Sequence, residues 1–213
     1  MQQIKLVALI AWACLALGSV CTAQLARIGA LSAAGASDEL KRAVEDNGYR
    51  LVLDQGWTAE FWFVRQLKTE TKDTSGALYP ELTNGEFVGV VDLPQGMTDF
   101  RGQAIPPGAY TLRYQLIPQD GNHMGVSPNP DFLLAIPIAS DRDPEQHYAY
   151  KKLVALSAQS TGSSHPAVIA LETANEPRSM SRDAQLTVLT IAIPTARGGA
   201  EKLGIVVKGT AAQ

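Results

Sequence analysis

Residues 107–118, PGAYTLRYQLIP, show the clearest period in the chain. Ala109, Thr111, Arg113 and Gln115 occupy every second position of this segment. The positions between them hold apolar and aromatic side chains, namely Tyr110, Leu112, Tyr114 and Leu116. A period of two places one set of side chains on a core and the other in water, which is typical of a strand in an antiparallel sheet.

Seven further segments carry strand signals, and turn residues separate them. They cover residues 49–54, 57–67, 84–93, 131–139, 165–172, 183–193 and 201–209. The strand–helix–strand rhythm that builds a parallel sheet does not occur among them. The sequence therefore predicts a mainly β protein, an antiparallel two-sheet β-sandwich of jelly-roll-like form, and a barrel is the alternative.

Two helices are expected beside the strands. A short N-terminal helix over residues 37–44 begins at Ser37, a good N-cap residue that acidic side chains follow in the first turn. An amphipathic helix is expected to begin at Asp143, with Pro144 at its first helical position, and to end near Gly162.

The N-terminus reads as a targeting segment. Lys5 precedes an apolar run over residues 6–20, and the small residue Ala23 follows it. This pattern predicts a signal peptide over residues 1–23, cleaved before Gln24. The apolar run is short for a membrane span, so no span is expected after cleavage, and the mature chain is expected to be secreted or periplasmic.

Cleavage would also remove both cysteines, Cys14 and Cys21. A mature chain without cysteine excludes thiol nucleophiles, redox dithiols and thiolate metal sites. A lipid anchor at Cys21 is the alternative to free release. Residues 24–36 are rich in Ala, Gly and Ser and are expected to form a flexible leader, and residues 37–213 are expected to form a single domain.

Composition argues against several classes of function. The formal net charge is −3, and no basic block accompanies it, so a nucleic-acid partner is not expected. The phosphate-binding loop and the dinucleotide fingerprint are both absent from the sequence, so no cofactor is expected.

Loops at one end of a sandwich commonly carry its binding site, and a surface aromatic can add to such a site. The candidate ligand-binding residues are Asp99, Arg101, Asp120, Asn122, His123, Asp131 and Trp62. Trp62 falls on the face opposite Phe61 and Phe63. It is therefore either an exposed ligand platform or a side chain that another element covers, and packing is favoured.

Residues 119–125, QDGNHMG, hold a carboxylate, an amide, an imidazole and a thioether. A copper or zinc site would use His123, with His147 or His165 arriving from elsewhere in the fold. A turn explains the same residues, since Gly, Asn and Asp suit tight connections, and the turn is favoured.

No nucleophile elbow or catalytic triad motif is present in the sequence, and no catalytic residue is assigned. Glu60, Asp92, Asp99 and Asp131 could supply a glycosidase-like pair if the fold brought two of them into one cleft.

The run IPPGAYTL, the DGNH of the following loop and the DFLL that begins the next strand occur in the same order elsewhere. In this pattern the chain resembles a group of uncharacterised secreted bacterial β-sandwich proteins. The resemblance implies export and a sandwich fold, and it implies no catalytic residues.

The function expected from the sequence is that of an exported, non-enzymatic binding or structural module of the bacterial envelope. A carbohydrate or another envelope component is the expected ligand class. A periplasmic metal-binding protein centred on His123 and a carbohydrate-active hydrolase using loop carboxylates remain as alternatives.

Overall fold

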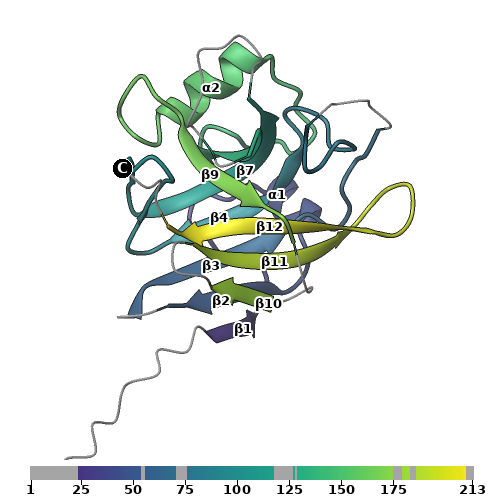
Figure 1. Cartoon of the computed structure of the whole chain (residues 1–213), viewed down its shortest axis with the longest axis horizontal. Helices are drawn as coiled ribbons and strands as arrows, with labels where there is room; N and C mark the ends of the chain where they lie inside the picture. The colour runs from purple at the N-terminus through teal and green to yellow at the C-terminus, as the bar shows by residue number, and fades with distance from the viewer. Residues whose placement is uncertain are drawn as a thin grey trace, which may run out of the picture.

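The computed structural model describes residues 24–53, 56–70, 76–117, 127, 129–174, 179–182 and 186–209, the backbone alone in 179–182 (Figure 1). Ten strands form one antiparallel sheet in the order β1-β2-β3-β4-β7-β8-β9-β12-β11-β10. Their bounds are β1 Gln24–Ile28, β2 Gly48–Val52, β3 Thr58–Phe63, β4 Phe87–Leu93, β7 Gly108–Leu116, β8 Asp131–Pro137, β9 Ala167–Glu172, β10 Ser179–Arg182, β11 Thr187–Pro194 and β12 Ala200–Lys208. A small hairpin pairs β5 (Met97–Thr98) with β6 (Ala104–Ile105), and the helices are α1 (Asp38–Ala43) and α2 (Tyr150–Ala158).

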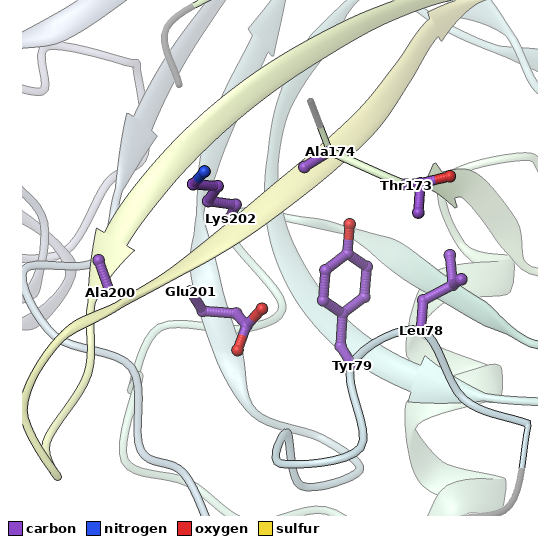
Figure 2. Close-up of a pocket in the computed structure, with 7 residues that line it drawn as sticks. All are labelled: Leu78, Tyr79, Thr173, Ala174, Ala200, Glu201 and Lys202. Atoms are coloured by element: carbon purple, nitrogen blue, oxygen red, sulfur yellow. The ribbon is translucent and has the colours of Figure 1, made fainter. Parts of the chain in front are cut away.

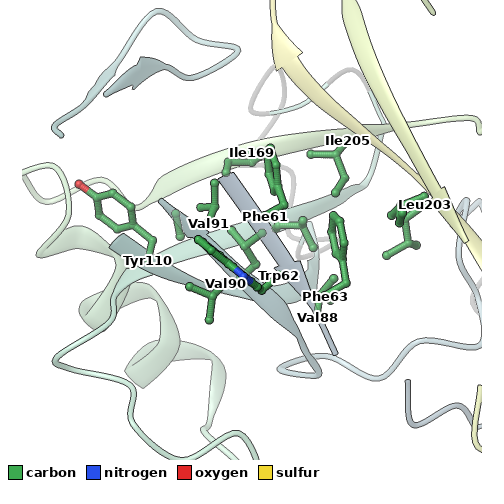
Figure 3. Packing of buried hydrophobic residues seen from close by; sticks show 14 of the residues in the cluster. Phe61, Trp62, Phe63, Val88, Val90, Val91, Tyr110, Ile169, Leu203 and Ile205 are labelled. Carbon is green, nitrogen blue, oxygen red and sulfur yellow. The ribbon is translucent and has the colours of Figure 1, made fainter. Parts of the chain in front are cut away.

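The large sheet curls into a half-barrel, so its two halves enclose one core. Phe61 and Phe63 of β3 belong to the same buried cluster as Leu203 and Ile205 of β12. Figure 3 shows these side chains converging from opposite sides of the cluster. The mainly β, antiparallel prediction is confirmed, whereas separate sandwich sheets are not.

The two halves are joined by a narrow connection. β9 pairs with β12 at only two positions, Gly204 with Glu172 and Ile205 with Leu171. By contrast, β7 and β8 pair at seven positions. The short β9–β12 ladder therefore makes the two halves one continuous sheet.

Helix α2 covers the outer face of β8 and β9, where Leu153 and Leu156 pack on Phe132, Leu134 and Val168. The predicted amphipathic helix is therefore present, but its predicted start at Asp143 is wrong. The helix begins at Tyr150, with Ala149 as the N-cap.

Arg113 explains the late start of α2. Its guanidinium donates to the carbonyls of Asp143 and Gln146, and the Asp143 carbonyl also accepts from the Gln146 amide in a turn, so this segment is anchored to Arg113 outside the helix. It also forms a buried ion pair with Asp141, Nε to Oδ2 at 2.7 Å. Residues 141–148 are thereby held against the sheet as a turn.

The N-terminal region corrects a second prediction. Helix α1 is present and Ser37 caps it by accepting from the Leu40 amide. The segment 24–36 is not a flexible leader, because it contains β1, which pairs with β2, and it buries Leu31. Its position explains Trp62, which is 1% exposed and donates its indole N–H to the Gly29 carbonyl.

Each of the eight segments predicted as strands overlaps one. Strands β1, β5, β6 and β10 were not predicted, and each is short or at a sheet edge. Within the described residues, neither helix has the length and apolar character needed to cross a membrane.

Candidate functional site

A pocket of about 350 Å³ lies where the chain leaves the end of β9 beside the start of β12 (Figure 2). It is lined by Leu78, Tyr79, Thr173, Ala174, Ala200, Glu201 and Lys202. Three separate segments of the sequence therefore form it.

The pocket exists because β9 and β12 separate beyond their short ladder. The Tyr79 hydroxyl lies between the two strands, donating to the Glu172 carbonyl at 2.6 Å and accepting from the Gly204 amide at 2.8 Å. A Cβ at Gly204 would lie 2.5 Å from the Glu172 carbonyl oxygen, so glycine permits this close approach. Figure 2 shows the Tyr79 ring between Leu78 and Glu201.

A buried carboxylate fixes the Leu78–Tyr79 wall of the pocket. Asp131 is fully buried and accepts from the amides of Leu78 and Tyr79 at 2.7 and 3.0 Å. It also accepts from the Tyr114 hydroxyl at 2.6 Å. The network therefore holds the Leu78–Tyr79 wall of the pocket rigid.

Both tyrosines remain protonated donors at neutral pH. Burial raises the pKa of Tyr79 to about 12. Burial, followed by the bond to Asp131, raises the pKa of Tyr114 as well. Neither hydroxyl has the lowered pKa that a general base at neutral pH would need.

The charged side chains that line the pocket are Glu201 and Lys202. Burial raises the pKa of the Glu201 carboxyl, and the charge of Glu81 raises it further. The Glu172 carboxylate lies at the same end and accepts from the Asn129 side-chain amide at 2.5 Å. A positively charged group entering the pocket would relieve this repulsion.

Asp99 and Arg101, predicted as ligand-binding residues, bond to each other. Asp99 is buried and accepts from Arg101 Nη2 at 2.8 Å and from the Gln103 amide. Arg101 also donates to the Pro166 carbonyl, tying the β5–β6 hairpin to the segment before β9. The pair therefore fastens a loop.

The structure separates these residues from Asp131. Asp99 and Arg101 lie near the start of β9, and Asp131 lies near its end, about 16 Å along the strand. Asp131 holds the Leu78–Tyr79 wall of the pocket through its hydrogen bonds and has no exposed surface. Asp120, Asn122 and His123 lie outside the described residues.

Trp62 does not offer an aromatic platform, because it is buried as the packing interpretation expected. The two described histidines, His147 and His165, are both exposed, and they lie before and after α2 in the sequence. Within the described ranges, no three His, Cys, Asp or Glu side chains are grouped so that they could hold a metal.

Of the four carboxylates considered for hydrolysis, the fold brings two together. Glu60 on β3 and Asp92 on β4 are direct cross-strand partners. Burial raises the pKa of Asp92, and the charge of Glu60 adds to this. Arg50 on β2 forms an ion pair with Glu60 at 2.6 Å.

The sequence-based search missed Tyr79, Glu201 and Lys202. Glu201 did carry a signal, because it shares the parity of Leu203, Ile205 and Val207 and therefore lies on the core face of its strand. Tyr79 lies outside the strands, and no period marks it.

Comparison with known proteins finds no relative, since no family model, no curated protein and no solved structure matches the chain.

Proposed function

We propose that this chain is an exported, non-enzymatic binding module of the bacterial envelope that binds its ligand in the pocket between β9 and β12. The observation that carries the proposal is the preformed pocket, whose wall the Asp131 network holds rigid. Rigid concave sites with a few convergent polar groups are typical of ligand binding.

Export is inferred from the first 23 residues, where Lys5, the apolar run and Ala23 have the arrangement of a cleaved signal. The mature chain would then be secreted or periplasmic.

The hydrogen bonds that the buried aspartates accept support binding rather than catalysis, because they give these carboxylates a structural role. Asp99, Asp131 and Asp141 are buried, and each accepts hydrogen bonds that fix a loop or a strand. These bonds account for the carboxylates by folding alone.

The test is a titration of the ¹⁵N-labelled mature chain with defined envelope probes. The probes are soluble muropeptides, a β-glucan oligosaccharide, and short basic and acidic peptides. At least one is expected to shift the amides of Ala174, Ala200 and Lys202. Thr173→Tyr, which fills the exposed rim, should weaken the shifts, and Glu39→Gln on distant α1 should not. If all the probes leave these amides unshifted, the proposed function is wrong.

A second candidate function, glycoside hydrolysis, is favoured by the Glu60–Asp92 pair. A carboxyl with a raised pKa beside a second carboxylate is the arrangement of a general acid and its partner. Release of dye from a labelled polysaccharide, abolished in Asp92→Asn, would support hydrolysis. Absence of release from wild-type protein would remove this candidate for that substrate.

A further inference from the structure

We infer that the pocket binds an extended peptide segment with a lysine or arginine side chain. The segment pairs with β12 at the position that β9 would occupy if it continued past Glu172. The inference rests on the proposed function and names the ligand class of that site.

Strand alternation gives the direction in which the backbone groups at the start of β12 point. The Gly204 amide points toward β9, because it donates to the Tyr79 hydroxyl beside Glu172. Backbone N–H and C=O groups of alternate residues point to the same side of an antiparallel strand. The N–H and C=O of Lys202 and Ala200 therefore also point away from β11 and toward the line of β9.

A second hydrogen bond confirms that odd-numbered and even-numbered residues of β12 point to opposite sides. The Thr195 amide donates to the Gly199 carbonyl at 3.2 Å, so the odd-numbered residues at the start of β12 bond toward the β11 side. Even-numbered Ala200 and Lys202 consequently present their backbone groups to the pocket that they line.

Among the described residues, no strand continues the line of β9 beside Ala200 and Lys202. Strand β9 ends at Glu172, two residues short of the position opposite Lys202. Thr173 and Ala174 then line the pocket instead of extending the ladder. An added strand would restore the backbone bonds that β9 no longer supplies, as in recognition by β-strand addition.

Charge selects the side chain of the added segment. The Glu201 side chain shares the inner face with Leu203, whereas alternation sends the Lys202 ammonium to the opposite face. Glu201 lies near Glu81, and Leu78 and Ala174 supply an apolar wall. A lysine or arginine can lay its aliphatic stem on this wall and place its charge beside Glu201.

A saccharide fits this site less well. Sugar rings stack on exposed aromatic faces, and the only aromatic side chain known to line the pocket, Tyr79, is 4% exposed. Its hydroxyl already makes two bonds within the fold. The available groups are backbone donors and acceptors with a carboxylate, which suit a peptide.

The experiment is an NMR titration with the peptide Ac-Thr-Val-Lys-Val-Thr-NH₂ on the mature chain. Three matched peptides accompany it: one with Gln for Lys, one with Glu for Lys, and one N-methylated at alternate residues. The lysine peptide is expected to shift the amides of Ala200 and Lys202 and to bind about two- to fivefold more tightly than the glutamine peptide, the range of an exposed ion pair. The N-methylated peptide should not bind.

Two chain variants separate the backbone contribution from the charge. Glu201→Gln should abolish the preference for lysine over glutamine and keep the binding itself. Lys202→Pro removes an N–H that does not bond to β11, so it should abolish binding, whereas Lys202→Ala should not. The N-methylated peptide makes the same test on unaltered protein if Lys202→Pro does not fold.

The outcomes distinguish this inference from the proposed function. Binding of a muropeptide or glucan at the same amides, with no peptide bound, would overturn the inference and leave the function standing. Equal affinity for the lysine and glutamate peptides, or shifts that depend only on protein concentration, would also overturn it. If no probe binds in the pocket, both proposals fail.

Discussion

Tyr79 shows how a single side chain can shape this molecule. Its hydroxyl bridges the Glu172 carbonyl and the Gly204 amide, so it replaces a direct bond of the β9–β12 ladder. Asp131 holds the Tyr79 backbone from the other side. The same residue thus joins the two halves of the sheet and forms a wall of the pocket.

Tyr79→Phe is expected to lower the free energy of unfolding by about 1–3 kcal/mol, because it leaves a buried carbonyl and a buried amide without their partner. Urea denaturation measures the change. Tyr49→Phe, also at a buried ring on the core, is the control and should have a much smaller effect. A Tyr79→Phe protein as stable as wild type would show that water replaces the hydroxyl.

At the scale of elements, the sheet positions α2 more than the helix's own sequence does. The Ser157 hydroxyl donates to the Ala135 carbonyl of β8 at 2.8 Å and accepts from the Ala167 amide of β9 at 3.0 Å. The Ser160 hydroxyl also donates to the Ala135 carbonyl. These bonds fix the register of the helix on both strands.

Ser157→Ala is expected to destabilise the protein by about 1–3 kcal/mol through loss of a buried donor–acceptor bridge. Amide hydrogen exchange should show the largest loss of protection in α2 and at Ala167. Ser164→Ala, at an exposed position after the helix, provides the comparison and should leave exchange unchanged. Equal exchange in the two variants would contradict the bridging role.

Over the whole molecule, curling of the sheet buries carboxyl groups and makes stability depend on pH. Burial raises the pKa of Glu86 above its ordinary value of 4.5, and the same cause acts on Asp92 and Glu201. In each case the folded chain holds a proton at a pH where the unfolded chain has lost it. The contribution of each carboxyl to the free energy of unfolding is fully present below its pKa in the unfolded chain. It is lost as pH rises through its pKa in the folded chain.

Glu86→Gln removes one such group and keeps an acceptor for the Lys68 amide, which bonds to Glu86 at 2.9 Å. Relative to wild type, the variant should gain stability between pH 4 and pH 7, measured as the difference in urea midpoints. For Glu39→Gln, the difference in urea midpoint from wild type should change with pH in the opposite direction, because a backbone hydrogen bond lowers the pKa of Glu39. A Glu86→Gln difference that does not change with pH would exclude the raised pKa.

The sequence by itself determined eight of the strands but not all of their faces, because Thr111, Arg113 and Gln115 of β7 were expected in water and are buried. A period of two depends only on neighbouring residues, so Tyr110 to Leu116 predicted β7 without knowledge of its partners. The cap at Ser37 was equally local and was confirmed. Asp143 and Pro144 were also a sound local signal, but Arg113, thirty residues before Asp143, bonds to the Asp143 and Gln146 carbonyls and holds this segment as a turn.

Only the tertiary structure decided how the sheet closes and where a pocket forms. The halves are joined by two residue pairs between β9 and β12 and by the hydroxyl of Tyr79, which is 93 residues from Glu172 in sequence. They are joined again where the Leu67 amide donates to the Pro194 carbonyl at the end of β11. The period of a strand reports which face is buried and does not report which strand lies beside it. Tyr79 contacts Glu172 and lines the pocket with Glu201, although the three residues come from separate segments of the chain, and no local pattern records such a meeting.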